Sequence, residues 1–247
     1  MTAGAVERGA AALTPLLANR DRIIVAARAI APLLNRVVFT GRQVAPLLQT
    51  SQVLPLARAT FAADAVVRVL SSGSLDRLPG ELQRLGFTRG ARSSVSDRWI
   101  LNEGVTLEFT HVAGDASDPA TVWLEYASLL TMAVDVGTAE TPLTARITGA
   151  PALVALDWAT YAASGESPLD SGEIEDIISF VATRAEIVHE IGKAPPELRS
   201  FVAAETRRFL AWDGAEHVMR SAIPGADRLP ALASRVAERL EKIAALG

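Results

Sequence analysis

Residues 170–191 read DSGEIEDIISFVATRAEIVHEI, and this stretch decides how the C-terminal half of the chain is expected to fold. Its apolar residues recur at spacings of three and four, which places them on one face of an α-helix. These residues are Ile174, Ile177, Ile178, Val181, Ala185 and Val188. Asp170, followed by Glu173, indicates the helix start, because both side chains can accept hydrogen bonds from unpaired backbone N–H groups. Glu175 and Asp176 add negative charge that the helix dipole favours, so one amphipathic helix is predicted up to residue 191.

The rest of the C-terminal half has the same helical character. Helical spacing of apolar residues extends over residues 152–162, 196–211 and 229–245. The dipeptides Pro195-Pro196 and Pro224-Gly225 separate the last of these stretches.

The N-terminal half mixes short strands with helices. Strands are predicted over residues 35–40, 63–70, 98–101, 105–110 and 143–147, where short apolar or alternating runs occur. Helices are predicted over residues 3–34, 42–49, 75–85 and 120–133, the last either alone or running into a strand over 132–136. The turn Asn102-Glu103-Gly104 favours a hairpin.

These patterns predict an α+β fold. A small mixed sheet flanked by helices is expected first, followed by a helical C-terminal region. The expected organisation is bracing helices over residues 1–35, an α/β domain over 36–150 and a helical domain over 151–247.

Composition narrows the class of protein. With 247 residues, 49% hydrophobic and 21% charged, the chain can bury a core and does not resemble a disordered protein. The absence of cysteine excludes disulfides and thiolate metal sites. A net charge of −4 gives no bias toward nucleic acid, and no apolar run reaches the ~18 residues of a membrane span. A cytoplasmic protein without a membrane or nucleic-acid partner is therefore expected.

Almost all of the basic residues are arginine rather than lysine. Of 24, only Lys193 and Lys242 are lysine, and the other 22 are arginine. Together with the high alanine content, this excess is interpreted as a bias of genomic composition.

Several motifs follow one another in a fixed order over residues 36–245. They are Val37-Val38-Phe39-Thr40-Gly41, Thr60-Phe61-Ala62-Ala63-Asp64, Leu82-Gln83-Arg84-Leu85-Gly86-Phe87, Arg98-Trp99, Leu107-Glu108-Phe109, Trp123 and residues 171–178. In this order they resemble the nucleotidyltransferase-like superfamily, of the AbiEii-toxin and small-substrate nucleotidyltransferase type. The resemblance implies a nucleotidyltransferase palm with a helical region packed on it.

The resemblance also implies a set of acids, because nucleotidyl transfer handles phosphoryl charge with Mg²⁺ held by carboxylates. The family places two acids at positions i and i+2 of a strand, which point to one side, and a third on a neighbouring strand. These positions correspond to Ala62, Asp64 and Glu108, so one acid is missing. Asp64 and Glu108 are the implied metal ligands, provided that Mg²⁺ is retained, and the candidate catalytic residues are Asp64, Glu108 and Asp157.

Other family positions have also changed. Arg42 stands where the family has the second glycine of a pair, and Asp157 stands where it has a lysine. An acid beside a triphosphate disfavours its binding, so Mg²⁺ and a nucleoside triphosphate are implied only for an active enzyme, and no other cofactor is expected. The candidate substrate-binding residues are Arg42, Arg68, Arg98, Trp99, Glu173 and Asp176.

Each candidate also has an explanation that requires no function. Asp64 can be an ordinary residue at a strand start, and Glu108 can belong to a solvated sheet face between Thr106 and Thr110. Glu173 and Asp176 are explained by the helix dipole, and Trp99 by burial in the core.

Three functions remain open from the sequence. The first is a nucleotidyltransferase-like protein with degenerate motifs that binds or transforms a small molecule without nucleotidyl transfer. The second is an active Mg²⁺-dependent nucleotidyltransferase that acts on the hydroxyl of a small molecule or a macromolecule. The third is a non-catalytic interaction protein. The missing acid and the change from lysine to Asp157 favour the first.

Overall fold

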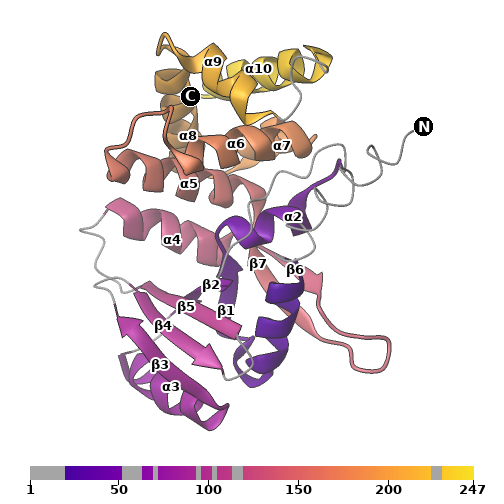
Figure 1. The fold of residues 1–247 in the computed structure, drawn as a ribbon, viewed down its shortest axis with the longest axis vertical. Helices are drawn as coiled ribbons and strands as arrows, with labels where there is room; N and C mark the ends of the chain where they lie inside the picture. Colours follow the sequence, from indigo (N-terminus) through magenta and orange to yellow (C-terminus); the bar gives the residue numbers. More distant parts are fainter. Residues whose placement is uncertain are drawn as a thin grey trace, which may run out of the picture. The chain divides into compact units, whose positions relative to one another are not determined.

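The computed structural model describes residues 20–51, 63–68, 72–92, 96–101, 105–112, 119–223 and 230–247. The chain divides into two compact units. The sheet unit comprises Met1–Leu47 and Ala57–Gly149, and the helical unit comprises Leu48–Leu56 and Ala150–Gly247. The predicted α+β class, a mixed sheet with helices followed by a helical region, is confirmed (Figure 1).

The sheet unit is built on a seven-stranded mixed sheet in the order β3-β4-β5-β2-β1-β7-β6. Its strands are β1 (Val37–Thr40), β2 (Ala63–Arg68), β3 (Phe87–Arg92), β4 (Ser96–Leu101), β5 (Val105–Val112), β6 (Thr131–Asp135) and β7 (Thr144–Thr148). The pairs β2–β5 and β1–β7 are parallel, and the other neighbours are antiparallel. The expected β4–β5 hairpin is therefore confirmed.

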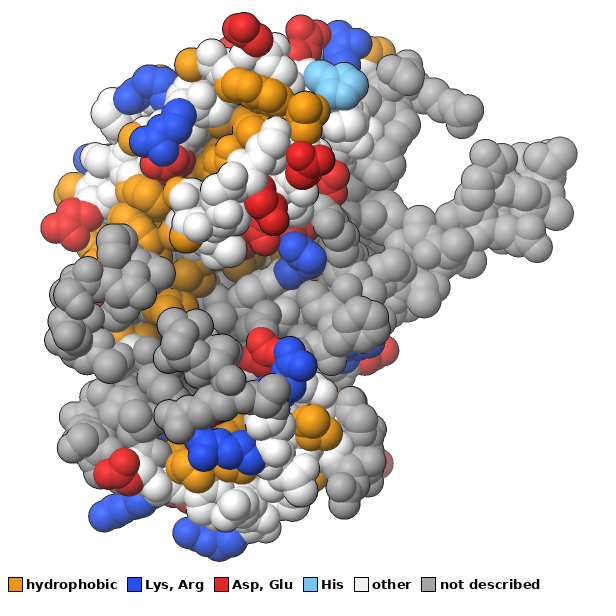
Figure 2. Space-filling view, turned by 60° about the vertical axis from the view of Figure 1, so that its left-hand side comes forward, with side chains coloured by type: hydrophobic (Ala, Val, Ile, Leu, Met, Phe, Trp, Pro, Cys, Tyr) orange, Lys and Arg blue, Asp and Glu red, His pale blue; other side chains and the backbone are white. Residues whose placement is uncertain are grey.

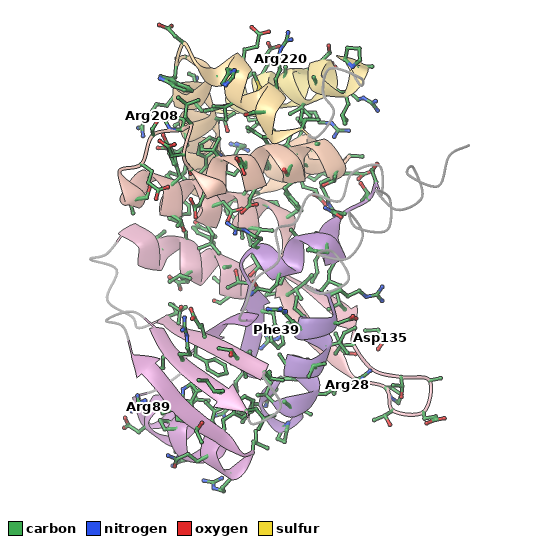
Figure 3. The ribbon with its side chains drawn as sticks, viewed as in Figure 1. Arg28, Phe39, Arg89, Asp135, Arg208 and Arg220 are labelled. Carbon is green, nitrogen blue, oxygen red and sulfur yellow. The ribbon has the colours of Figure 1, made fainter. Side chains whose placement is uncertain are left out.

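Helices cover the strands because one face of the sheet is strongly apolar. Residues 20–29 are helical and are followed by η1 (Ala31–Leu33), η2 (Arg42–Val44), α2 (Ala45–Leu48), α3 (Ser72–Arg84) and α4 (Pro119–Leu129). Phe39, Leu107 and Phe109 are fully buried, and Phe39 lies in the interior of the unit (Figure 3). Helix α4 packs on β1, β2, β5 and β7.

The helical unit consists of α5 (Ala150–Ser164), α6 (Gly172–Thr183), α7 (Ile187–Lys193), α8 (Pro196–Leu210), α9 (Ala215–Ala222) and α10 (Pro230–Ala244). Helix α6 is its most buried element, and it contacts α5, α9 and α10. The Trp158 and Phe209 rings, from α5 and α8, lie 6.1 Å apart between their centroids. None of the described helices is long and apolar enough to cross a membrane.

The start of α6 differs by one residue from the prediction. Ser171, not Asp170, is the N-cap, and its hydroxyl accepts a hydrogen bond from the Ile174 backbone N–H at 3.3 Å. The predicted acids are confirmed in the first turn, which contains Glu173 and Glu175. Serine is as good an N-cap as aspartate, so the side-chain chemistry did not distinguish the two positions.

The prediction of one helix up to residue 191 is wrong, because the helix breaks at Arg184. The carbonyl of Thr183 accepts hydrogen bonds from the backbone N–H groups of Thr50 and Ser51, at 3.1 and 3.0 Å. The Thr50 hydroxyl in turn accepts from the Ala185 N–H at 2.9 Å. The segment around Thr50 thus replaces the intrahelical bonds, and the chain restarts as α7 at Ile187.

Candidate functional site

Three candidate residues and Thr40 lie in one row across the sheet. The register pairs Thr40 with Asp64, Asp64 with Glu108, and Glu108 with Arg98, on the neighbouring strands β1, β2, β5 and β4. Asp64 and Glu108, which lie 44 residues apart in the sequence, thus come to adjacent backbone positions. We call these four residues the polar row.

Within the polar row, Arg98 and Glu108 form an ion pair. The Arg98 guanidinium donates to Glu108 Oε1 from Nε at 2.7 Å and also from Nη2. The side chains are 49% and 25% exposed, so water screens the attraction only in part. Because both donors converge on Oε1, the second carboxylate oxygen, Oε2, receives no hydrogen bond from the described residues.

Thr40 is a polar-row residue that the sequence did not single out. Its side chain is 7% exposed, and its hydroxyl oxygen has no hydrogen-bond partner among the described residues. Burying a hydroxyl without a partner costs free energy, so such a group in a native structure requires an explanation. The only sequence signal was its place before Gly41, whose positive φ of 74° ends β1.

Trp99 lies beside Arg98 on β4, but it is only 1% exposed and pairs in register with the buried Leu107. Arg89, labelled in Figure 3, is a residue of β3. Its guanidinium carbon lies 5.6 Å from the centroid of the Trp99 ring. Arg89 Nη2 also donates to both carboxylate oxygens of Asp97, at 3.0 and 2.9 Å. Trp99 therefore belongs to a packed cluster, and its proposed contact with substrate stays a prediction.

The two other basic candidates lie at strand ends. Arg42 begins η2 directly after Gly41, and it is half-buried. Arg68 is the last residue of β2, where its backbone pairs with Val112. Arg42 thus follows the end of β1, two residues after Thr40.

The remaining candidates lie in the helical unit. Asp157 is a half-buried residue of α5, next to the buried Trp158. Glu173 and Asp176 belong to α6, and Glu173 accepts a hydrogen bond from the Ser171 hydroxyl at 3.1 Å. Capping and helix-dipole interactions account for Glu173, whereas Asp64 and Glu108 come together in the sheet unit.

The polar row does not fit the three-carboxylate Mg²⁺ site that the family resemblance implies. No group of three His, Cys, Asp or Glu side chains that could hold a metal ion occurs within the described part of the chain. The row has two acidic residues, and a guanidinium already neutralises one of them. A cation attracted by two carboxylates loses much of that attraction when an internal cation occupies one. The position of Ala62 lies outside the described residues.

No family model matches the chain, and no curated protein matches it. Among solved structures, it is similar to an antigenic nucleotidyltransferase-like protein from Paracoccidioides brasiliensis, with 15% identity, a TM-score of 0.44, and coverage of 89% of this chain and 92% of that one. It is also similar to JHP933 from Helicobacter pylori, with 10% identity, a TM-score of 0.42, and coverage of 99% and 93%. At these TM-scores, the similarities carry no argument about the chemistry of the polar row.

Proposed function

We propose that the chain is a nucleotidyltransferase-like protein with degenerate motifs, which binds a small polar molecule at the polar row without Mg²⁺-dependent nucleotidyl transfer. The observation that carries this proposal is the ion pair of Arg98 with Glu108, in register with Asp64. An arginine placed at this carboxylate supplies internally the positive charge that a metal ion would otherwise bring.

A ligand with several hydroxyl or ammonium groups suits the row best. The second oxygen of Glu108 and the hydroxyl of Thr40 are acceptors without partners among the described residues, and Asp64 is the residue between them in register. Carboxylates and hydroxyls accept hydrogen bonds, and a ligand donor would remove the cost of the unpaired Thr40 hydroxyl. We include in the proposal the cytoplasmic location that the sequence led us to expect.

The second candidate is an active nucleotidyltransferase. One observation favours it: Asp64 and Glu108 are adjacent in register on neighbouring strands, an arrangement in which two carboxylates can share a metal ion. It requires that a bound Mg²⁺–nucleotide displaces Arg98 from Glu108.

Titration calorimetry with nucleoside triphosphates, each with and without Mg²⁺, separates the two candidates. We expect no Mg²⁺-dependent binding by the natural chain. The double variant Ala62→Asp/Arg98→Leu should acquire it, because it restores the missing acid and releases Glu108. Ala62→Asp/Arg77→Leu is the matched control, since Arg77 is an exposed residue of α3 in the same unit.

Binding of Mg²⁺–nucleotide by the natural chain at micromolar affinity, on the order of −8 kcal/mol, and its loss in Glu108→Gln would replace our proposal with the active enzyme. For ligand binding, spermidine and glucosamine are the probes. Binding of either one should weaken in Glu108→Gln and remain unchanged in Arg77→Leu. If neither probe bound, or if Glu108→Gln had no effect, the polar row would not be a ligand site.

A further inference from the structure

A hollow of about 600 Å³ lies in the helical unit, between α7 and α10. Among the described residues that line it, every charged or titratable side chain is basic: His189 and Lys193 from α7, and Arg239 and Lys242 from α10. A hollow elsewhere in the same unit, of about 740 Å³ between the end of α8, α9 and α10, has a mixed lining with three acids and one arginine. On the face drawn in Figure 2, basic and acidic side chains are likewise interspersed. The basic lining of the first hollow therefore differs from the mixed lining of the second.

Both lysines of the chain line this hollow. Lys193 and Lys242 lie 49 residues apart in a sequence that uses arginine at the other 22 basic positions. A general composition bias explains why lysine is rare, but it does not explain why the two remaining lysines converge. Lysine presents a compact, strongly hydrated ammonium with rotatable donors, whereas arginine presents a planar fork. The hollow thus carries both ammonium groups of the chain's lysine side chains.

The nearby acids compensate this charge only in part. Lys242 pairs with Glu238 at 2.7 Å, but both side chains are about 60% exposed, so water screens the pair. Arg239 donates to the carbonyls of Val181 and Ala182, at 2.7 and 3.1 Å, at the C-terminal end of α6. Burial, and then the neighbouring Arg235, lowers the pKa of Arg239, while Glu186 and Glu238 act in the opposite direction. Of the four basic side chains that line the hollow, Lys242 alone forms an ion pair with an acid among the described residues, so the described lining keeps a net positive charge.

The hollow also offers apolar surface beside its charges. Ala185, Val188 and Leu246 belong to its lining. A ligand that fills it should carry an anionic group for the lysines and an organic body for the apolar residues, because apolar surface is stabilised by contact with apolar atoms. An inorganic anion would meet only the first requirement.

We propose that this hollow is a binding site for a small organic phosphate. The ammonium groups of Lys193 and Lys242 bind the phosphate oxygens, and Arg239 holds the positive potential at the base of the site. Lysine is a regular phosphate ligand as a point charge, and a phosphate offers several strong acceptors. This site lies in the helical unit and is separate from the polar row, so it does not depend on the function proposed for the row.

The two lysines make the test simple, because a lysine-selective acylating reagent has only two side-chain targets in the chain. The full-length protein is acylated with and without Mg²⁺-free ATP, and the rate at each lysine is measured by mass spectrometry. At an ATP concentration of about ten times its Kd, we expect acylation of both lysines to slow about tenfold, because protection follows the occupancy of the site. Pyrophosphate at the same concentration should protect less, because it has no organic body for the apolar residues.

Binding is then measured by calorimetry on variants. Lys193→Gln/Lys242→Gln should weaken Mg²⁺-free ATP binding at least about tenfold, and Lys193→Arg/Lys242→Arg should restore part of it, since charge is kept but the ammonium geometry is lost. Arg220→Gln is the control, because this arginine of α9 lines the other hollow. Glu108→Gln should leave this binding unchanged, which separates the hollow from the polar row.

Three outcomes would overturn the proposal. The first is equal acylation rates with and without ATP. The second is unchanged ATP affinity in the double glutamine variant. The third is protection of the lysines by a short oligonucleotide but not by ATP, which would assign the hollow to a nucleic-acid backbone instead of a small phosphate.

Discussion

Two pairs of arginine and glutamate illustrate how the same chemistry serves different purposes in the two units. In the sheet unit, Arg98 directs two N–H groups to a single oxygen of Glu108, and the arginine side chain is 49% exposed. In the helical unit, Arg184 directs Nε and Nη2 to separate oxygens of Glu190, and its side chain is 12% exposed. Arg184 Nη1 also donates to the carbonyl of Leu48.

The two pairs differ in how many parts of the structure the arginine connects. Arg184 uses all three of its nitrogens to bridge the α6–α7 break and the segment at Leu48. The side-chain hydrogen bond to Glu190 raises the pKa of Arg184, and burial acts in the opposite direction. Arg98 connects two strands that the backbone ladder already joins. The Arg184–Glu190 pair should therefore contribute more to stability. The Arg98–Glu108 pair should instead determine which ligand the surface accepts.

The largest expected effect is that of Arg184→Ala. It leaves Glu190 and the carbonyl of Leu48 without a partner in a half-buried place, so the helical unit should lose about 2 kcal/mol of unfolding free energy. Urea denaturation followed by hydrogen exchange of the helical-unit amides measures this loss. Arg184→Lys keeps the charge without the fork, and it should lose roughly half as much. A loss of less than about 0.5 kcal/mol in Arg184→Ala would place this pair with ordinary surface ion pairs.

Arg98→Leu should have a smaller effect on stability than Arg184→Ala. The pair is partly solvated, so the sheet unit should lose only about 0.5 kcal/mol. Its effect on ligands should be greater, because no guanidinium then offsets the negative charge of Glu108, and spermidine should bind more tightly. Hydrogen exchange of the β4 and β5 amides and calorimetry with spermidine measure the two quantities. A loss of more than about 2 kcal/mol would mean that the pair supports the fold, contrary to the comparison.

The sequence was sufficient where local patterns decide the structure. Alternation of Val105, Leu107 and Phe109 with polar residues predicted β5, and both Leu107 and Phe109 are fully buried. The ion pair was also accessible in principle. If Leu101 pairs with Val105, as it does in the structure, counting back along the hairpin pairs Arg98 with Glu108.

The sequence was insufficient where partners distant in the chain decide the structure. The break after Thr183 depends on Thr50 and Ser51, which no periodicity within α6 can reveal. Strand β3 was not predicted, because the apolar residues of Phe87–Arg92, Phe87 and Ala91, do not alternate with polar ones over the segment and Gly90 lies within it, and β4 supplies its pairing. The unpartnered hydroxyl of Thr40 likewise emerges only when β1 and β2 are placed in register.

The smallest expected effect concerns a third pair, in which Arg220 and Glu216 lie four residues apart on α9. Arg220 Nη2 donates to Glu216 Oε1 at 2.8 Å, but the side chains are 63% and 74% exposed. Water already solvates both charges, and ordering two long side chains costs entropy, so Arg220→Ala should change the unfolding free energy by only about 0.3 kcal/mol. Urea denaturation at low salt and at 1 M salt tests this, because the residual attraction should vanish at high salt, where the Debye length is about 3 Å.

Three ion pairs of similar geometry are thus expected to have a large, a modest and a negligible effect on stability, in the order in which water is excluded from them. A loss in Arg220→Ala that equalled the loss in Arg184→Ala would show that burial is not what ranks them.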